Sequence, residues 1–175
     1  EIESPASIQL EFEPRDEEHV VADLFRENGD FILRRSLPRE RGTILLGKIA
    51  PGDYRVFVAA SSGVAERHDV TLTKGSLHRI ACTLASGTIV RTEILVGGAL
   101  NKLKRAGPTE LRFRDSKGSV VFEEMRIPDE RSRIRLQIGL TPGDYTVEAL
   151  CFDGRGAVRA FTVGNEDHLI RLALQ

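Results

Sequence analysis

The sequence predicts an all-β protein built from two tandem seven-stranded Greek-key β-sandwich domains, residues 1–86 and residues 87–175. Three observations predict this fold class. One sequence element recurs after about half the length of the chain, and apolar residues alternate with polar ones over many short segments. No long segment shows the 3.6-residue apolar period of an amphipathic helix. Short alternating segments separated by turn residues are typical of sandwiches.

The internal repeat divides the chain. Residues 49–54 read Ile-Ala-Pro-Gly-Asp-Tyr, and residues 140–145 read Leu-Thr-Pro-Gly-Asp-Tyr, an offset of 91 positions. The similarity continues downstream, where residues 70–84 correspond to residues 161–174 with one residue of gap. Two copies of one domain are the simplest interpretation. We expect the boundary near residue 86.

Each copy contains seven segments with the alternation of a β-strand. In copy one these are residues 7–13, 20–26, 31–35, 43–49, 54–60, 64–73 and 77–84. In copy two they are residues 89–96, 110–114, 120–126, 132–140, 145–152, 157–163 and 168–174. Residues 16–28 also fit helical spacing, so a short helix is the alternative to a strand at that point.

The Pro-Gly-Asp-Tyr element has a physical explanation. Pro fixes φ at the first central position of a turn, and Gly accepts the positive φ that a type II turn requires at the second. The strand that follows begins with Tyr, and its alternate residues share one face, which we expect to point inward. These residues are Tyr54, Val56, Val58 and Ala60 in copy one and Tyr145, Val147, Ala149 and Cys151 in copy two. We expect each Tyr hydroxyl to bond a backbone partner at the end of its domain.

This order of features resembles the carboxypeptidase regulatory-like domains. An apolar strand, the Pro-Gly-x-Tyr turn, an alternating strand, a Gly-containing hairpin and two further strands occupy residues 45–84 and again residues 134–174. Copy two also has an Asp-Ser-Lys-Gly hairpin at residues 115–118. The resemblance implies a transthyretin-like (prealbumin-like) sandwich, or more loosely an immunoglobulin-like one. It also implies use as an accessory module of bacterial cell-envelope and secreted proteins.

Composition excludes several classes of function. The chain has 25 Lys and Arg against 26 Asp and Glu, so it lacks the basic excess that binding to nucleic acid or an anionic membrane needs. Trp is absent and there are 2 Tyr, too few for an aromatic platform that stacks bases. No apolar run approaches the roughly 20 residues of a membrane-spanning helix. We therefore expect no nucleic-acid partner, no membrane-spanning segment and no cofactor.

The sequence carries no motif for catalysis or metal binding, such as Gly-x-Ser-x-Gly, His-x-x-x-His or Cys-x-x-Cys. His68 and Asp69 are adjacent, but neighbouring strand residues point to opposite faces, which argues against an acid–base pair. Acidic residues within 13–18 could collect Ca²⁺, yet their spacing matches no calcium loop and favours a solvated loop. Cys82 and Cys151 lie at inward-facing positions, so we expect two separate buried thiols and no disulfide.

Arginines of copy two form the candidate binding site. Copy one has a net charge of −3 and copy two of +2. The candidate residues are Arg112, Arg114, Arg131, Arg133 and Arg135. Arg131, Arg133 and Arg135 alternate with other residues along one predicted strand, and Arg112 and Arg114 do so along another. If these two strands are neighbours in a sheet, the five guanidinium groups share one surface. Such a surface suits an acidic glycan or peptide. The alternative is a solvated face paired with acidic cross-strand residues such as Glu93, Glu123 and Glu124.

From these observations we expect a non-catalytic accessory or structural module that is a piece of a larger, extracytoplasmic bacterial protein. One alternative is a ligand-binding module that uses the copy-two arginines to hold an acidic glycan or a peptide. The other is a part of an enzyme whose active residues lie outside this chain. The extracytoplasmic location follows from the family resemblance, and a protein or glycan partner fits either non-catalytic function.

Overall fold

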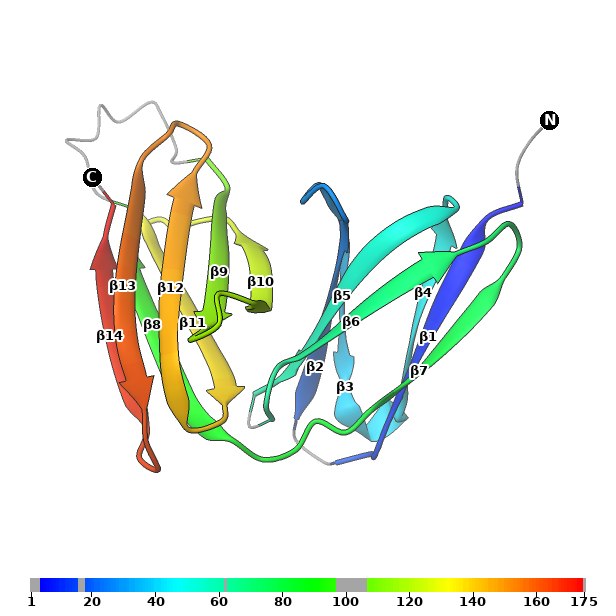
Figure 1. Ribbon diagram of the computed structural model, residues 1–175, viewed down its shortest axis with the longest axis horizontal. Coiled ribbons are helices and arrows are strands. Elements are labelled where there is room, and N and C mark those ends of the chain that lie inside the picture. Colours follow the sequence, from blue (N-terminus) through cyan, green and yellow to red (C-terminus); the bar gives the residue numbers. More distant parts are fainter. Residues whose placement is uncertain (1–3, 16–17, 62, 97–106, 175) are drawn as a thin grey trace. The chain divides into compact units, whose positions relative to one another are not determined.

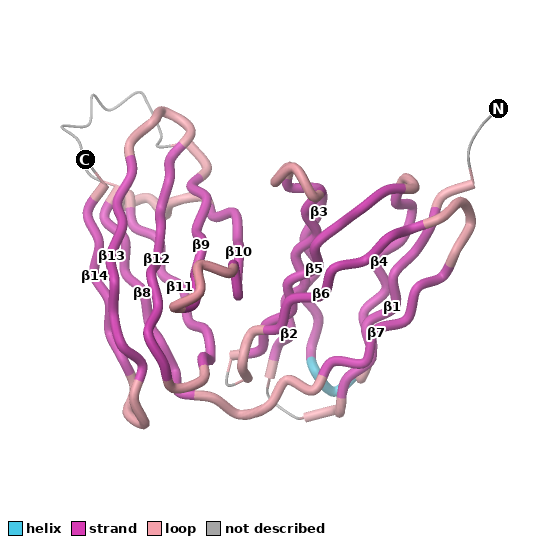
Figure 2. Tube along the Cα trace, viewed as in Figure 1, coloured by secondary structure: helices cyan, strands magenta, loops and turns pink. Residues whose placement is uncertain are grey.

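The computed structural model describes residues 4–15, 18–61, 63–96 and 107–174. The chain divides into two compact units, Glu1–Ser86 and Gly87–Gln175, which we call unit 1 and unit 2. Each is built of strands in two sheets (Figures 1 and 2). Within the described ranges, no helix is long and apolar enough to cross a membrane. The prediction of an all-β, two-sheet sandwich in each half is confirmed.

Seven strands and one short 3₁₀ helix are described in unit 1. They are β1 (Ala6–Phe12), β2 (His19–Arg26), β3 (Phe31–Pro38), η1 (Arg39–Arg41), β4 (Thr43–Ile49), β5 (Gly52–Ala60), β6 (Glu66–Leu72) and β7 (Leu77–Cys82). Each predicted segment overlaps one of these strands. The alternative helix within residues 16–28 is wrong for residues 19–26, which form β2, and residues 16–17 lie outside the described part of the chain.

The described strands of unit 2 follow the same succession. They are β8 (Thr88–Leu95), β9 (Thr109–Asp115), β10 (Val120–Arg126), β11 (Arg133–Leu140), β12 (Gly143–Cys151), β13 (Gly156–Val163) and β14 (His168–Ala173). The predicted hairpin between β9 and β10 is present. The Gly118 amide donates to the Asp115 carbonyl at 2.9 Å, and the Asp115 side chain accepts the amides of Lys117 and Ser119, each at 2.9 Å.

The two units share one topology. Unit 1 has sheets ordered β4-β1-β7 and β3-β2-β5-β6, and unit 2 has β11-β8-β14 and β10-β9-β12-β13, the same orders shifted by seven strands. In both units the first and last strands pair in parallel and the other pairs are antiparallel. Lettered A to G, the sheets are D-A-G and C-B-E-F, whereas an immunoglobulin constant domain has A-B-E-D and C-F-G. The likeness to immunoglobulin domains therefore concerns the sandwich architecture and not the strand order.

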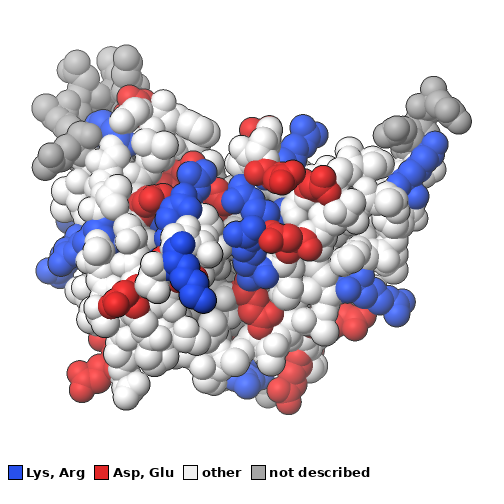
Figure 3. Space-filling view, in the orientation of Figure 1, with Lys and Arg blue, Asp and Glu red and all other residues white. Residues whose placement is uncertain are grey.

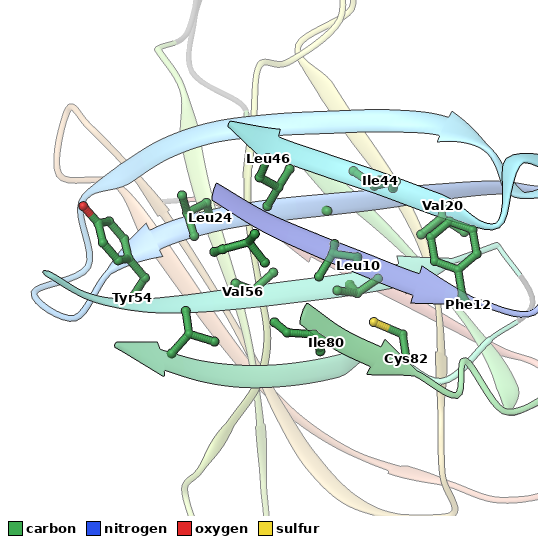
Figure 4. Packing of buried hydrophobic residues seen from close by; sticks show 14 of the residues in the cluster. Leu10, Phe12, Val20, Leu24, Ile44, Leu46, Tyr54, Val56, Ile80 and Cys82 are labelled. Atoms are coloured by element: carbon green, nitrogen blue, oxygen red, sulfur yellow. The ribbon is translucent and has the colours of Figure 1, made fainter. Parts of the chain in front are cut away.

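The hydrophobic core of unit 1 lies between its two sheets. Leu10 of β1, Leu24 of β2, Ile44 of β4 and Val56 of β5 are fully buried there (Figure 4). Fully burying a side chain of this size contributes about 1.5–3 kcal/mol relative to leaving it exposed. The alternation seen in the sequence is therefore the alternation between this core and the outer faces of the sheets.

The Pro-Gly-Asp-Tyr element closes one end of each sandwich. Gly52 and Gly143 have φ of +147° and +157°, more extended than the roughly +80° of a type II turn but still in the region that favours glycine. The Tyr54 hydroxyl donates to the Ala50 carbonyl at 2.9 Å, and the Tyr145 hydroxyl to the Thr141 carbonyl at 2.9 Å. The prediction of a buried ring with a backbone-bonded hydroxyl is confirmed in both units, and the turn type is corrected.

Helix η1 supplies a buried charge that the sequence did not reveal. The Arg39 side chain is fully buried, donates to the Glu18 carboxylate at 2.5 Å and donates to the Glu13 carbonyl at 3.0 Å. Glu18 is therefore a buried ion-pair partner, and the expectation of a solvated loop is wrong for this residue. Asp16 and Glu17 of the same segment lie outside the described residues.

Candidate functional site

The structure distributes the candidate arginines over two sheets and a turn. Arg112 and Arg114 lie in β9, which pairs with β10 and β12, whereas Arg133 and Arg135 lie in β11, which pairs with β8. Because β9 and β11 belong to different sheets, the condition under which the five arginines would share one surface is not met. The five arginines do not form one sheet surface.

Arg131 lies outside the strand. The Asp129 carboxylate accepts the backbone amides of Arg131 at 2.9 Å and Arg133 at 2.8 Å, and Ser132 has a φ of +56°. These contacts make a tight turn before β11 begins at Arg133. The prediction that Arg131 continues the alternation of Arg133 and Arg135 is corrected for this reason.

The arginines of β9 are surrounded by carboxylates. Arg112 donates to Glu123 at 3.0 Å and also pairs with Glu110, and Arg114 donates to Glu148 at 3.1 Å. Burial and the neighbouring Glu123 raise the pKa of Glu110 to about 7, against the opposing effect of Arg112. This face of unit 2 matches the alternative of a sheet face held by cross-strand ion pairs.

The arginines of β11 form a different arrangement. Arg135, Glu93 of β8 and Arg171 of β14 lie opposite one another on one row across the sheet. The Glu93 carboxylate is 3.6 Å from Arg135, 3.4 Å from Arg171 and 3.6 Å from Arg133. Three guanidinium groups thus share one carboxylate at long distances, so the row carries excess positive charge. We call Arg133, Arg135, Arg171 and Glu93 the arginine row.

A cavity of about 370 Å³ adjoins the arginine row on the outer face of the same sheet. Arg91, Gln137 and the exposed Leu169 line it together with Glu93 and Arg135. Apolar and guanidinium surfaces side by side suit a ligand that has both a ring or chain and an anionic group. Elsewhere, Lys and Arg are interspersed with Asp and Glu over the face that Figure 3 shows.

A second cluster lies where the edge strands β6 and β7 of unit 1 meet. Glu66 and His68 project from β6, and Cys82 ends β7. The His68 Nε2 atom is 3.1 Å from a Glu66 carboxylate oxygen and 3.9 Å from the Cys82 sulfur. Asp69 pairs with Arg67 at 2.9 Å on the other face, so His68 and Asp69 do not act together, as the alternation predicted.

This cluster was not predicted from the sequence. Glu66 and His68 are two residues apart in a strand, a spacing that places both side chains on one face. The spacing of Glu66 and His68 is therefore visible in the sequence, although only the adjacent pair of His68 and Asp69 was considered above. Cys82 lies in another sheet, and its proximity follows from how the two sheets close at β6 and β7.

The environment of each group in the cluster is distinct. Burial, with a smaller contribution from Glu66, raises the pKa of the Cys82 thiol to about 12. The thiol is therefore protonated at neutral pH in this arrangement. Cys151 is buried in unit 2, and both cysteines are free, so the prediction of two separate buried thiols is confirmed. Figure 4 shows Cys82 pointing between the sheets, at the opposite end of the sandwich from Tyr54.

Comparisons with known proteins concern the architecture. No family model and no curated protein matches the chain. Among solved structures, it is similar to the Bacillus anthracis TIE protein (12% identity, TM-score 0.41), covering 98% of this chain and 34% of that one. It is also similar to a streptococcal ancillary pilin (14% identity, TM-score 0.35), covering 97% of this chain and 62% of that one. The shaft pilin SpaA from Lactobacillus rhamnosus GG matches with 9% identity and a TM-score of 0.34, covering 99% and 98% of the two chains.

Two of these three structures are pilins. The chain spans about a third of the length of the first of these proteins and less than two thirds of the second. At these identities the likeness describes the fold alone, and it assigns no ligand or reaction to the residues described above.

Proposed function

We propose that this chain is a non-catalytic accessory module, related to the carboxypeptidase regulatory-like domains, within a larger extracytoplasmic bacterial protein. The observation that carries the proposal is the repetition of one complete sandwich. Both units have the same strand order, an apolar face turned inward and a turn closed by a tyrosine hydroxyl. Only residues 83–87 separate β7 from β8. Domains repeated with short junctions are suited to spacing or presenting other parts of a protein.

The charged groups of the sheet faces support the same function. Arg34 binds Asp23 in unit 1 and Arg112 binds Glu123 in unit 2, each across neighbouring strands. Such pairs stabilise sheet faces, whereas an enzyme requires titratable groups that converge on a substrate pocket.

The test is replacement within the full-length protein that carries the chain. Residues 1–175 are exchanged for two unrelated β-sandwich domains of similar size, and the location and activity of the full-length protein are measured. A spacing module predicts that both are retained. If activity is lost and returns only with the original chain, the residues of this chain act directly and the proposal is wrong.

A second function, binding of an acidic glycan through unit 2, is favoured by the arginine row. Its three guanidinium groups share one carboxylate, and an external carboxylate would find donors already gathered. The adjoining cavity offers the apolar surface of Leu169 to a sugar ring. This function is compatible with a spacer that also attaches to a surface.

Binding to an array of anionic glycans tests this second function. The double variant Arg135→Ser/Arg171→Ser should weaken binding about tenfold or more, because charge-assisted hydrogen bonds contribute about 1.5–3 kcal/mol each. Arg155→Ser, in the exposed hairpin pair with Asp153, removes one positive charge elsewhere in unit 2 and should leave binding unchanged. Equal binding by the double variant and the original chain would sink the idea.

A further inference from the structure

We propose that Glu66, His68 and Cys82 bind a zinc ion at the junction of β6 and β7 in unit 1. The three side chains offer an oxygen, a nitrogen and a sulfur atom, and all of these atoms lie within 4.8 Å of one another. Carboxylate, imidazole and thiolate are the three ligand types that proteins use for zinc. Magnesium and calcium prefer sites made of oxygen alone, so this mixture favours a transition metal.

Two of the distances between the ligand atoms lie close to what one tetrahedral ion requires. Ligand atoms at about 2.0–2.3 Å from zinc in tetrahedral geometry lie about 3.3–3.6 Å from each other. The nitrogen-to-oxygen distance here is 3.1 Å, slightly below that range, and the sulfur-to-nitrogen distance is 3.9 Å, slightly above it. His68 Nε2 takes part in both contacts and therefore lies next to the position of the ion.

A backbone hydrogen bond orients the Glu66 carboxylate. One of its oxygens accepts the Leu84 backbone amide at 2.5 Å, while the other faces His68. Leu84 has a φ of +45°, which is rare for a bulky residue. Hydrogen bonds of this kind orient metal ligands in proteins.

The exposures of the three groups define the kind of site. The Cys82 residue is 6% exposed, whereas the His68 and Glu66 side chains are 25% and 18% exposed. Solvent therefore reaches the His68 and Glu66 side of the cluster, where a water molecule completes four-coordination. On binding, the Cys82 sulfur loses its proton to solvent and bonds the ion as a thiolate.

The repeat shows that the fold itself does not need these residues. The registers with β12 and β8 place Ala157, Arg159 and Leu172 of unit 2 where unit 1 has Glu66, His68 and Cys82. None of these three can bind zinc, and unit 2 has the same topology. The cluster therefore belongs to unit 1 and has no counterpart at the equivalent positions of unit 2.

Titration of the metal-free chain with Zn²⁺, followed by calorimetry against a competing chelator, tests the proposal. We expect one site, and an affinity that His68→Gln and Glu66→Gln each weaken by at least the roughly 10–100-fold that loss of an outer partner costs. The controls are Cys151→Ser, the other buried thiol, and His78→Gln, an exposed histidine of β7. Both controls should bind as the original chain does.

Cobalt provides a readout of the thiolate. Co²⁺ bound at this site should show a sulfur-to-cobalt charge-transfer band that is kept by Cys151→Ser and lost in Cys82→Ser. Circular dichroism of each metal-free variant checks that it is folded. If Cys82→Ser does not fold, the variants of the partly exposed His68 and Glu66 still test the proposal. Absence of saturable zinc binding, a band that survives Cys82→Ser, or a loss of affinity in His78→Gln would each overturn the proposal.

Discussion

The same position of the repeat carries different chemistry in the two units. Where β6 and β7 meet, unit 1 has the cluster of Glu66, His68 and Cys82. Where β13 and β14 meet, the Arg159 guanidinium donates to the Arg171 carbonyl at 2.8 Å, and the rings of Phe161 and His168 stack. The same edge of the sandwich thus carries different contacts in the two units, so a specific function can arise there in one copy.

A second pair of positions has exchanged its charges. Asp23 of β2 binds Arg34 of β3 through two bonds of 2.7 Å, and the equivalent strands of unit 2 place Arg112 opposite Glu123. Both units thus have an ion pair at this position, with the acidic and basic residues exchanged between the two strands. Cross-strand complementarity is therefore what the fold retains, and the net charge of each unit is free to change.

The largest expected difference between the units concerns the centre of their first strands. Leu10 of β1 lies between Ile44 and Ile80, and Thr92 of β8 holds the equivalent position in unit 2. Leu10→Ala should lower the free energy of unfolding of unit 1 by about 2–5 kcal/mol, because it removes a fully buried side chain and leaves a cavity. Differential scanning calorimetry measures it. Thr92→Ala is the matched control, and an equal loss from both variants would contradict the comparison.

Thr92 is also a position where a substitution should stabilise unit 2. Its hydroxyl is buried, and within the described residues it has no hydrogen-bond partner. Thr92→Val keeps the shape and removes the unsatisfied group, so it should raise the free energy of unfolding of unit 2 by about 1–2 kcal/mol. Urea denaturation gives the change. A destabilised variant would show that the hydroxyl is satisfied in solution.

The two tyrosines should respond alike. Tyr54→Phe and Tyr145→Phe each remove one hydroxyl bond to a backbone carbonyl four residues upstream, and each should cost about 0.5–1.5 kcal/mol. Thermal unfolding of both variants measures the loss. Clearly different losses of stability in the two variants would mean that the Thr141 side chain, 3.0 Å from the Tyr145 hydroxyl, alters the contribution of that hydroxyl.

A dependence of stability on pH is expected for unit 2 alone. Because the pKa of Glu110 is raised from 4.5 to about 7, the folded state holds this proton more tightly than the unfolded state. The free energy of unfolding should therefore fall as pH rises from about 4.5 to about 7. Glu110→Gln, which cannot ionise, should flatten this slope in urea titrations at several pH values. Val21 occupies the equivalent place in unit 1, so unit 1 lacks this carboxylate. An unchanged slope in the variant would exclude Glu110 as its source.

Much of the fold could be predicted from the sequence because the signals are local. Alternation identified each strand, and the Pro-Gly-Asp-Tyr element placed Tyr54 and Tyr145 at the closed ends of the sandwiches. The arginines were harder, because a strand sequence shows which residues share a face but not which strand lies beside it. The sequence therefore leaves open whether Arg112 and Arg135 share a surface, and the structure places their strands in different sheets.

The cluster of unit 1 shows the same limit more strongly. Glu66 and His68 share a strand face, which the period of two reveals. Cys82 reaches them from a second sheet, through a contact that depends on the closure of the whole sandwich. No spacing along the chain encodes that proximity, so it became visible only in three dimensions.

The parallel pairing of β1 with β7, and of β8 with β14, determines how each unit would carry tension. When the first and last strands run in the same direction, the chain enters a unit at one end of the sheet and leaves at the other. A pull between the two ends then acts along the strands, so the hydrogen bonds of the ladder are loaded together in shear and are not opened one at a time. Each unit is thus connected in the way that resists extension.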